Sequence, residues 1–360
     1  MSVVRKINNY RRNIMRSLTK NVGKPTMQDD FILVDKSEIK KVLICRPNGR
    51  LGNLLLITPL VQEVAEMFPN CKIDLFVKGT LAPIIFENYD VIDKTIHLPK
   101  KPFKSLVEYS KVWISLKKTP YDLAINVDQN SSSGRLAVQF SNAKYKFFGD
   151  SGEEDIERKS DFEHIAKYPV YNFRNYLSKL RLPTNSNKII APLDLKLTSS
   201  EIADGRKKLS EITKNDKKTI CIFTYATGPK CLSEEWWEKF YSQLVTEYKN
   251  YNIIEILPVE NVSQIGFKAP TFYSKDIREI GSVIANADLF IGADSGIMHL
   301  SSAVHTPTIG LFSVSNMKKY EPYDNCSTAI DVNLCTKKEY IKTINSILNN
   351  GRLDIYSRAI

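Results

Sequence analysis

The sequence predicts an α/β protein with two domains, each built on a parallel sheet covered by helices on both faces. Short apolar segments typical of buried strands alternate with segments of helical periodicity along most of the chain. The alternation starts again after a polar linker at residues 183–192, so it occurs twice. The 360 residues are enough for two domains that each bury a core of their own.

Composition agrees with a globular chain and excludes several classes of protein. Hydrophobic residues make up 42% and charged residues 25%, which is ordinary for globular domains. No apolar run approaches the ~20 residues that span a bilayer, and no secretory signal pattern is found. The six cysteines are scattered without a C-x-x-C pair, which predicts a reducing cytoplasm and no zinc site. Cys45, Cys71 and Cys221 fall in or beside predicted strands, as buried free thiols do.

The net charge of +11 is unevenly distributed, and the first 28 residues contain many cations and no acid. Apolar residues recur between these cations at helical intervals, which predicts a basic amphipathic helix that docks on the anionic surface of a membrane. A solvated arm, or a helix packed on its own protein, is the alternative. Nucleic acid also attracts such a charge, but no nucleic-acid-binding motif accompanies it, so we expect no nucleic-acid partner.

A basic arm at residues 1–39 is followed by the first predicted domain, residues 40–190. A strand at residues 41–45 leads through a loop with two glycines into an apolar helix at residues 54–68. The glycine spacing matches neither the dinucleotide fingerprint nor a P-loop. The pattern then alternates through predicted strands at 72–77, 94–97, 122–128 and 144–148 and predicted helices at 81–88, 103–117, 134–141 and 162–180.

The second predicted domain, residues 191–335, repeats the α/β pattern. Its first helix opens at Thr198 with the sequence TSSE, which matches a capping box. Further elements are strands at 219–223, 253–257 and 308–312 and helices at 233–248 and 275–287, together with the segment at 289–302. A final helix at 337–348 lies in the tail 336–360, which we expect to pack back on the first domain.

The clearest candidate site is the segment 289–302, which reads LFIGADSGIMHLSS. Its apolar start predicts a buried strand that ends at Asp294, and a helix is predicted from Ser295 onward. Ligands of open α/β sheets bind where strands end and helices begin, and the free N–H groups of a helix start suit a phosphate or diphosphate. Gly296 would let the backbone approach a ligand, and His299 shares a helix face with Ser295. An ordinary N-cap followed by a helix-face histidine is the alternative.

A second candidate lies in the loop at residues 224–230, between a predicted strand and a helix. Thr227 and Lys230 stand at the mouth of that strand in a glycine-containing loop. A diphosphate bound there would gain a hydroxyl and a cation. Taken alone, such a lysine is more often an ordinary surface charge.

Two stretches resemble the signature regions of the ADP-heptose:lipopolysaccharide heptosyltransferase family, glycosyltransferase family 9. The first reads RPNGRLGNLLLITPL at residues 46–60, with Phe68-Pro69 closing the helix. It is similar to the family pattern of a strand, R-x-x-x-x-G-(D), an apolar run, T-P-L and F-P. The second reads DSGIMHL at residues 294–300, followed by Thr306-Pro307 and an apolar strand. The resemblance runs in the correct order from about residue 40 to residue 312.

The resemblance implies a GT-B fold, in which two Rossmann-like domains with parallel sheets face each other across a cleft. It implies an inverting, metal-independent transfer of a heptose or similar sugar from a nucleotide-sugar to a lipid-linked glycan such as the lipopolysaccharide core. ADP as the nucleotide rests on family similarity alone, and neither a cofactor nor a metal is expected. The protein would be cytoplasmic and would associate peripherally with the inner membrane through residues 1–28.

The resemblance also carries site residues over to this chain. The donor side would hold the diphosphate, the ribose and the sugar through Thr227, Lys230, Glu260, Asp294, Ser295, Gly296 and His299. The acceptor side would consist of Arg50, Gly52, Asn53 and His164, the last resembling a histidine that opens the family's interdomain helix. Asn53, Asp128 and His299 are the candidates for catalysis, and Asp128 begins a D-Q-N turn similar to one in the family.

One departure from the family pattern concerns the general base. The family has an aspartate directly after the glycine of the first loop, and this chain has Asn53 there. An amide cannot accept the proton of an acceptor hydroxyl. Three accounts follow: another carboxylate serves as base, with Asp128 as first choice; the acceptor needs little activation; or the protein binds its ligands without turnover.

Three classes of function therefore remain open on the sequence. A glycosyltransferase acting on a surface glycan is the leading interpretation. A non-catalytic paralogue that binds a nucleotide-sugar or a lipid acceptor is motivated by Asn53. Another GT-B enzyme, such as a nucleotide-sugar epimerase, would release or epimerise the sugar without any acceptor.

Overall fold

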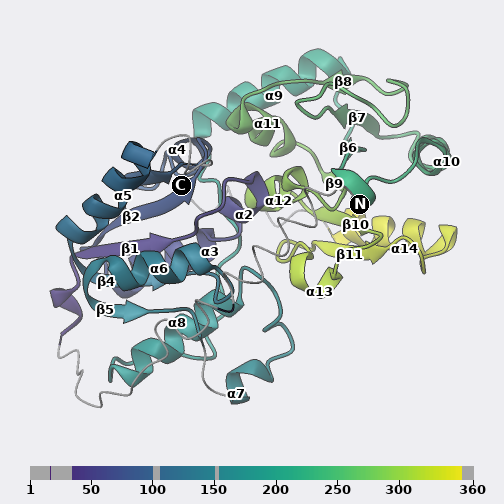
Figure 1. Cartoon of the computed structure of the whole chain (residues 1–360). Helices are drawn as coiled ribbons and strands as arrows, with labels where there is room; N and C mark the ends of the chain where they lie inside the picture. The colour runs from purple at the N-terminus through teal and green to yellow at the C-terminus, as the bar shows by residue number, and fades with distance from the viewer. Residues whose placement is uncertain (1–16, 18–34, 100–105, 151–153, 351–360) are drawn as a thin grey trace. The chain divides into compact units, whose positions relative to one another are not determined.

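The computed structural model describes residue 17 and residues 35–99, 106–150 and 154–350. The chain forms two compact units, whose elements are drawn in Figure 1. The first unit consists of the described residues within 1–50, 59–83 and 89–191, and the second of those within 51–58, 84–88 and 192–360. The basic amphipathic segment predicted at residues 1–28 lies outside the described residues, apart from Ser17.

The first unit contains a five-stranded sheet in which every pair of neighbouring strands is parallel. Its order is β3-β2-β1-β4-β5, the 3-2-1-4-5 arrangement of a doubly wound Rossmann-type sheet. The strands are β1 (Lys41–Cys45), β2 (Lys72–Lys78), β3 (Ile92–Leu98), β4 (Pro120–Asn126) and β5 (Asn142–Phe147). Four of the five residues of β1 are buried, as a central strand covered on both faces requires.

The helices near the start of the chain differ from the single helix predicted at residues 54–68. The structure has α2 (Leu51–Leu55) and then α3 (Thr58–Met67), separated by two residues. Pro59 explains the break, because proline has no N–H to donate into a preceding turn and is tolerated only in the first turn of a helix. The following elements are α4 (Ala82–Ile85), α5 (Leu106–Lys118), α6 (Ser132–Phe140), α7 (Glu154–Glu157) and α8 (Tyr168–Lys179), and a short 3₁₀ helix, η1 (Lys36–Glu38), precedes β1.

The second unit contains a six-stranded parallel sheet with the order β11-β10-β9-β6-β7-β8. Counted along this unit, the order is 6-5-4-1-2-3, which is the Rossmann order read from the other edge. The strands are β6 (Thr219–Phe223), β7 (Asn252–Ile256), β8 (Thr271–Phe272), β9 (Leu289–Ala293), β10 (Thr308–Phe312) and β11 (Thr328–Asp331). Two parallel sheets confirm the predicted α/β fold class, although β8 and β11 were not predicted.

Besides α2, the second unit contains the helices α9 (Ser199–Thr213), α10 (Glu234–Glu247), α11 (Ile277–Ile284), α12 (Gly296–Ala303), α13 (Met317–Tyr320) and α14 (Lys337–Asn350). The last of them, α14, lies in the tail 336–360 that the sequence analysis expected to pack on the first domain. Tyr340 and Ile344 of α14 belong to the core of the second unit, together with Trp237 and Phe240 of α10. The Tyr340 and Phe240 rings meet edge to face, with their centroids 5.4 Å apart. Burial of these large apolar side chains therefore fixes α14 within the second unit.

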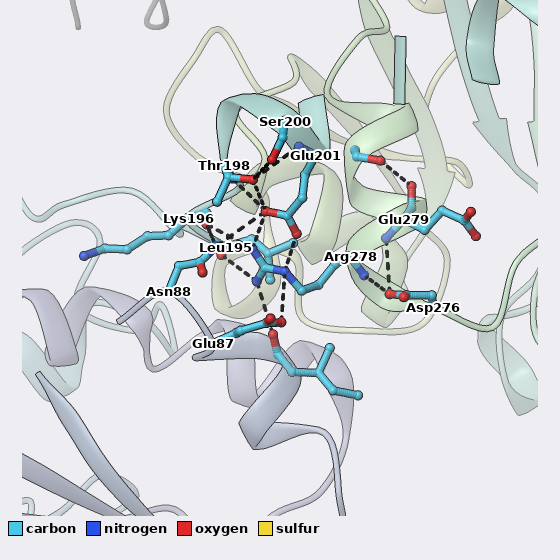
Figure 2. A network of polar contacts seen from close by, with 12 residues as sticks. Glu87, Asn88, Leu195, Lys196, Thr198, Ser200, Glu201, Asp276, Arg278 and Glu279 are labelled. Carbon is cyan, nitrogen blue, oxygen red and sulfur yellow. Dashed lines mark hydrogen bonds and ion pairs between the residues drawn. The ribbon is translucent and has the colours of Figure 1, made fainter. Parts of the chain in front are cut away.

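Arg278 of α11 ties residues 84–88 into the second unit, as Figure 2 shows. Its guanidinium donates to both carboxylate oxygens of Glu201, at 2.5 and 2.9 Å, and to the carbonyl oxygens of Ile84 and Lys196. The side chain is only 7% exposed. Because a buried guanidinium needs partners for its donors, this network holds residues 84–88 beside the start of α9.

Two smaller predictions can be checked against the described residues. Cys45, Cys71 and Cys221 are buried and free, as their positions in the sequence predict. Among the helices within the described ranges, none combines the length and the apolar character needed to cross a bilayer.

Candidate functional site

The strand order of the second sheet reverses between β6 and β9. From this point the chain builds one side of the sheet through β7 and β8 and the other side through β10 and β11. Loops that leave the carboxyl ends of the two strands therefore diverge, and such a switch point is where open α/β sheets bind ligands. Both candidate segments predicted from the sequence, residues 224–230 and 289–302, fall at this edge.

Lys230 and Asp294 form an ion pair at this switch point. Asp294 directly follows β9, and Lys230 ends the short 3₁₀ helix η3 (Gly228–Lys230) in the loop after β6. The lysine Nζ lies 2.6 Å from Oδ2 of the aspartate, and the two side chains are 36% and 5% exposed respectively. The carboxylate is therefore buried behind the cation, which reaches the solvent. Lys230 and Asp294, which were predicted as site residues from separate sequence motifs, are therefore in contact.

The start of α12 adjoins this pair. Ser295 is the N-cap of the helix, and its hydroxyl oxygen accepts a hydrogen bond from the Met298 N–H at 3.3 Å. This is the ordinary capping geometry, so the cap that the sequence offered as an alternative is present. The remaining N–H groups of the first turn and the helix dipole still give this edge a partial positive charge.

Gly296 has a structural reason to be glycine that the sequence did not reveal. A Cβ atom at this position would lie 3.1 Å from Cβ of Leu51 and 3.3 Å from the backbone nitrogen of Gly52. A Cβ atom on Gly52 would in turn lie 2.7 Å from Cδ2 of His299. The two glycines therefore let α2 and α12 approach closely, and the buried imidazole of His299 packs in this contact.

Thr227 and Glu260 are both exposed at the same edge of the sheet. Thr227 is the N-cap of η3, and its side chain makes no capping hydrogen bond. Glu260 follows β7, the second strand of this unit. In Rossmann-type sheets, an acid at the end of the second strand is placed to hydrogen-bond a ribose.

A buried glutamate that the sequence analysis did not single out organises the loop that carries Glu260. Glu255 of β7 is fully buried and accepts hydrogen bonds from the hydroxyls of Thr224, at 2.6 Å, and Ser263, at 2.7 Å. Burial raises the pKa of Glu255, and these two hydrogen bonds oppose that rise. Because Ser263 also accepts from the N–H of Ile265, the carboxyl group connects the ends of β6 and β7 to this loop.

The first sheet has its own switch point, between β1 and β4. Arg46 directly follows β1, and its Nη1 lies 2.7 Å from Oδ2 of Asp128, which follows β4. Oδ1 of Asp128 accepts from the N–H of Asn130 at 3.0 Å, as expected of the predicted turn. The arginine side chain is 6% exposed and the aspartate 26%, so here the acid is the more accessible partner.

The remaining acceptor-side candidates are not all in one unit. Arg50 is exposed, and its N–H donates to Asn48 Oδ1 at 3.0 Å. His164 is 2% exposed, and its Nδ1 accepts from the N–H of Ala166 in the turn before α8. Asn53 lies in α2, which groups with the second unit, whereas Arg50, Asp128 and His164 belong to the first.

Tyr320 of α13 also belongs to the edge that carries the lysine–aspartate pair. Its ring centroid lies 5.5 Å from Nζ of Lys230. No motif marks Tyr320 in the sequence, and α13 was not predicted, so only the folded chain reveals the contact. Within the described ranges, no group of three or more histidine, cysteine, aspartate or glutamate side chains is arranged to hold a metal ion.

Comparison with known proteins bears on the family resemblance. Residues 274–346, which include α12 and the Asp294 motif, match the model of glycosyltransferase family 9 (heptosyltransferase). This match over one part of the chain, together with the relatives below, supports the resemblance to glycosyltransferase family 9. The lipopolysaccharide heptosyltransferase 3 of Escherichia coli is 22% identical over 293 residues, covering 76% of this glycosyltransferase and 84% of the relative.

Solved structures of family members share the fold of this glycosyltransferase. A family 9 glycosyltransferase from Veillonella parvula superposes with a TM-score of 0.66 at 16% identity, covering 86% of this chain and 97% of the other. The E. coli ADP-heptose lps heptosyltransferase II gives a TM-score of 0.63 at 15% identity, with coverage of 87% and 99%. These likenesses confirm the GT-B fold class that the sequence motifs implied.

Proposed function

We propose that this family 9 glycosyltransferase moves a heptose, or a closely similar sugar, from ADP-heptose to the core of lipopolysaccharide or a related surface glycan. The transfer inverts the anomeric centre and needs no metal ion. The names of the relatives support the sugar and the acceptor. We assign the reaction to the cytoplasmic face of the inner membrane, with residues 1–28 as the segment that docks on the lipid surface.

The observation that carries this proposal is the ion pair between Lys230 and Asp294 beside the start of α12. Because the ammonium is the more exposed partner, it is available to the phosphate oxygens of a donor. The N-terminal N–H groups of α12 add partial positive charge at the same edge. The Thr227 hydroxyl supports the same diphosphate, and Glu260 suits the ribose of the nucleotide.

In the proposed reaction, a hydroxyl oxygen of the acceptor attacks the anomeric carbon of the sugar from the face opposite the diphosphate. The new carbon–oxygen bond forms as the bond from that carbon to the diphosphate oxygen breaks, so the sugar is inverted and ADP leaves. Lys230 and the start of α12 stabilise the negative charge that grows on the leaving diphosphate. The proton of the acceptor hydroxyl passes to a carboxylate base.

Asp128 is our candidate for that base. Its carboxylate is partly exposed, with Arg46 buried behind it as a fixed hydrogen-bond donor, so one side of the carboxylate remains accessible to an acceptor hydroxyl. Asn53 stands where the family motif has its aspartate, and its amide can hydrogen-bond an acceptor but cannot take up a proton. We assign Asn53 and Arg50 to acceptor positioning.

Gly52, His299 and His164 act indirectly in this proposal. Gly52 and His299 hold α2 against α12, so they fix the helix start at which the diphosphate binds. His164 holds the turn that leads into α8 through its hydrogen bond with Ala166.

Turnover by the purified protein tests the proposal. With ADP-heptose and a truncated lipopolysaccharide core, we expect ADP release that depends on the acceptor and persists in EDTA. NMR of the product should show the anomeric configuration opposite to that of the donor. Nucleotide binding without turnover would instead identify a non-catalytic binding protein, the alternative that Asn53 motivates. Sugar release or epimer formation without any acceptor would contradict glycosyl transfer.

A further inference from the structure

A third strand contributes to the edge of the second sheet at which Lys230 and Asp294 meet. β10 pairs with β9 on the side away from β6, so the carboxyl ends of β6, β9 and β10 are successive neighbours. The chain after β10 forms α13, whose N-cap Asn316 accepts a hydrogen bond from the N–H of Lys319 at 3.3 Å. This cap fixes the short helix that carries Lys319 and Tyr320.

The Tyr320 ring lies close to two ammonium groups from different loops. Nζ of Lys230 is 5.5 Å from the ring centroid, and Nζ of Lys319 is 5.7 Å from it. A cation within about 6 Å of an aromatic centroid is attracted by the negative face of the ring. The ammonium groups of Lys230 and Lys319 therefore share one aromatic neighbour, Tyr320.

The balance of charges at this edge gives Lys319 a role in binding an anion. Lys230 is paired with the carboxylate of Asp294, so that pair adds no net charge to a binding site. The diphosphate of a nucleotide-sugar carries two negative charges, and a second cation adds a net attraction that the neutral Lys230–Asp294 pair lacks. The Tyr320 ring attracts the Lys319 ammonium without cancelling its charge, since the ring is neutral.

We propose that Lys319 is a second phosphate-binding lysine of the donor site and that Tyr320 is the residue that positions Lys230 and Lys319. The ligand is the diphosphate of a nucleoside diphosphate or nucleotide-sugar. This inference rests on the proposed function, because it takes the donor to bind beside the Lys230–Asp294 pair. It adds the loop after β10 to a site otherwise assembled from the loops after β6, β7 and β9.

The neighbouring lysine provides a matched control for the charge. Lys318 is exposed on the same helix, so Lys318→Met and Lys319→Met remove the same charge from adjacent positions. Calorimetric titration of the full-length protein with ADP, AMP and adenosine measures the effect. We expect Lys319→Met to weaken ADP binding about tenfold, AMP binding less and adenosine binding not at all, because a charge-assisted contact to phosphate is lost. Lys318→Met should bind all three like the wild type.

Two substitutions of Tyr320 test the role of its ring. Tyr320→Phe keeps the aromatic face and should retain wild-type ADP affinity. Tyr320→Leu fills similar space without that face, and we expect ADP binding about two- to fivefold weaker, as for loss of a modest cation–π contact. The KM for the donor should rise by the same factor while kcat stays unchanged. A merely structural role would instead lower the melting temperature and leave the affinity of the folded protein intact.

The possible failures are distinguishable. Equal ADP affinities of Lys319→Met and Lys318→Met would overturn the assignment of Lys319. Wild-type affinity in Tyr320→Leu would overturn the positioning role. If the wild-type protein bound no nucleoside diphosphate, or if Lys230→Met bound ADP as tightly as the wild type, the proposed donor site itself would be refuted.

Discussion

The two sheets each carry an ion pair at the same topological position. The more exposed partner is the acid in one pair and the cation in the other. In each sheet the pair joins the loops that follow the first and fourth strands of the unit. In the first sheet, the cation of the Arg46–Asp128 pair is buried and the acid is the exposed partner. In the second, the acid of the Lys230–Asp294 pair is buried and the cation is exposed.

This difference in exposure determines which ligand groups can bind at the edge of each sheet. An exposed carboxylate with a guanidinium behind it presents acceptor oxygens to hydroxyl groups, whereas an exposed ammonium with a carboxylate behind it attracts phosphate. In our proposal, the same strand order supplies a proton acceptor in one unit and a phosphate-binding cation in the other. These are the two functions that the proposed metal-independent transfer requires of the protein.

The largest expected effect comes from removing the exposed acid of the first pair. Asp128→Asn keeps the shape and the hydrogen bond to Asn130 but cannot accept a proton. We expect kcat to fall about 10²–10⁴-fold, as for loss of a general base, with the dissociation constant for ADP unchanged.

A matched control for this variant lies in the same unit. Asp150 also pairs with a buried arginine, Arg135, at 2.9 Å, and Asp150→Asn should leave kcat unchanged. Equal kcat values for Asp128→Asn and Asp150→Asn in steady-state assays would show that the first pair is structural, and the comparison between the sheets would fail.

The next effect comes from removing the buried acid of the second pair. Asp294→Ala leaves Lys230 without its anionic partner and, in our proposal, removes contacts to the donor sugar. We expect kcat/KM for the donor to fall about ten- to a hundredfold, the range of one or two charge-assisted hydrogen bonds. Affinity for ADP, which lacks the sugar, should change less. If ADP and the nucleotide-sugar lose affinity by the same factor, Asp294 acts only by positioning Lys230.

A smaller effect, in the opposite direction, is expected from Asn53→Asp. This substitution restores the acid of the family motif in α2. We expect a gain in kcat of several-fold and at most about tenfold, because a second carboxylate adds to a base already present. The double variant with Asp128→Asn sharpens the test, since the carboxylate introduced at position 53 should recover part of the lost rate. No recovery would mean that position 53 does not reach the acceptor hydroxyl.

The smallest expected effect is on the thermal stability of the second unit. Burial raises the pKa of Glu201, but hydrogen bonds from Arg278 and Thr198 lower it more, to about 2 from an ordinary 4.5. A lowered pKa means that the carboxylate stabilises the fold above its unfolded pKa and that this contribution is lost as the pH falls toward the folded value. The melting temperature of Glu201→Gln should therefore lie below that of the wild type at neutral pH, and the difference should shrink on acidification.

The control for this pH dependence is an exposed glutamate of the same helix, α9. Glu211→Gln should leave the melting temperature unchanged at every pH, because Glu211 is exposed on the same helix. A difference between the wild type and Glu201→Gln that stayed constant from neutral to acid pH would contradict the role of the carboxylate charge.

The sequence predicted the central strands well because their signal is local. β1, β6 and β10 begin and end at the predicted residues, since each is a short apolar run that must be buried on both faces. The edge strands β8 and β11 have two and four residues, too few to show a periodicity. The break between α2 and α3 was missed although Pro59 marks it, because the apolar run continues through the break.

The site was predictable only where it follows motifs. Lys230 and Asp294 were selected from separate loops, but their contact depends on the neighbouring positions of β6 and β9 in the sheet. The packing of Gly296 against α2, and the Tyr320 contact with Lys230, join segments far apart in the chain. The burial that orients the two ion pairs is likewise a property of the folded sheets, so their opposite polarity cannot be deduced from residue types.

A crystal structure of the protein with bound ADP tests the central claim most directly. We predict that phosphate oxygens lie about 3 Å from Nζ of Lys230 and beside the first N–H groups of α12. A diphosphate bound instead at Arg46 in the first unit, or away from the carboxyl ends of β6 and β9, would contradict the account.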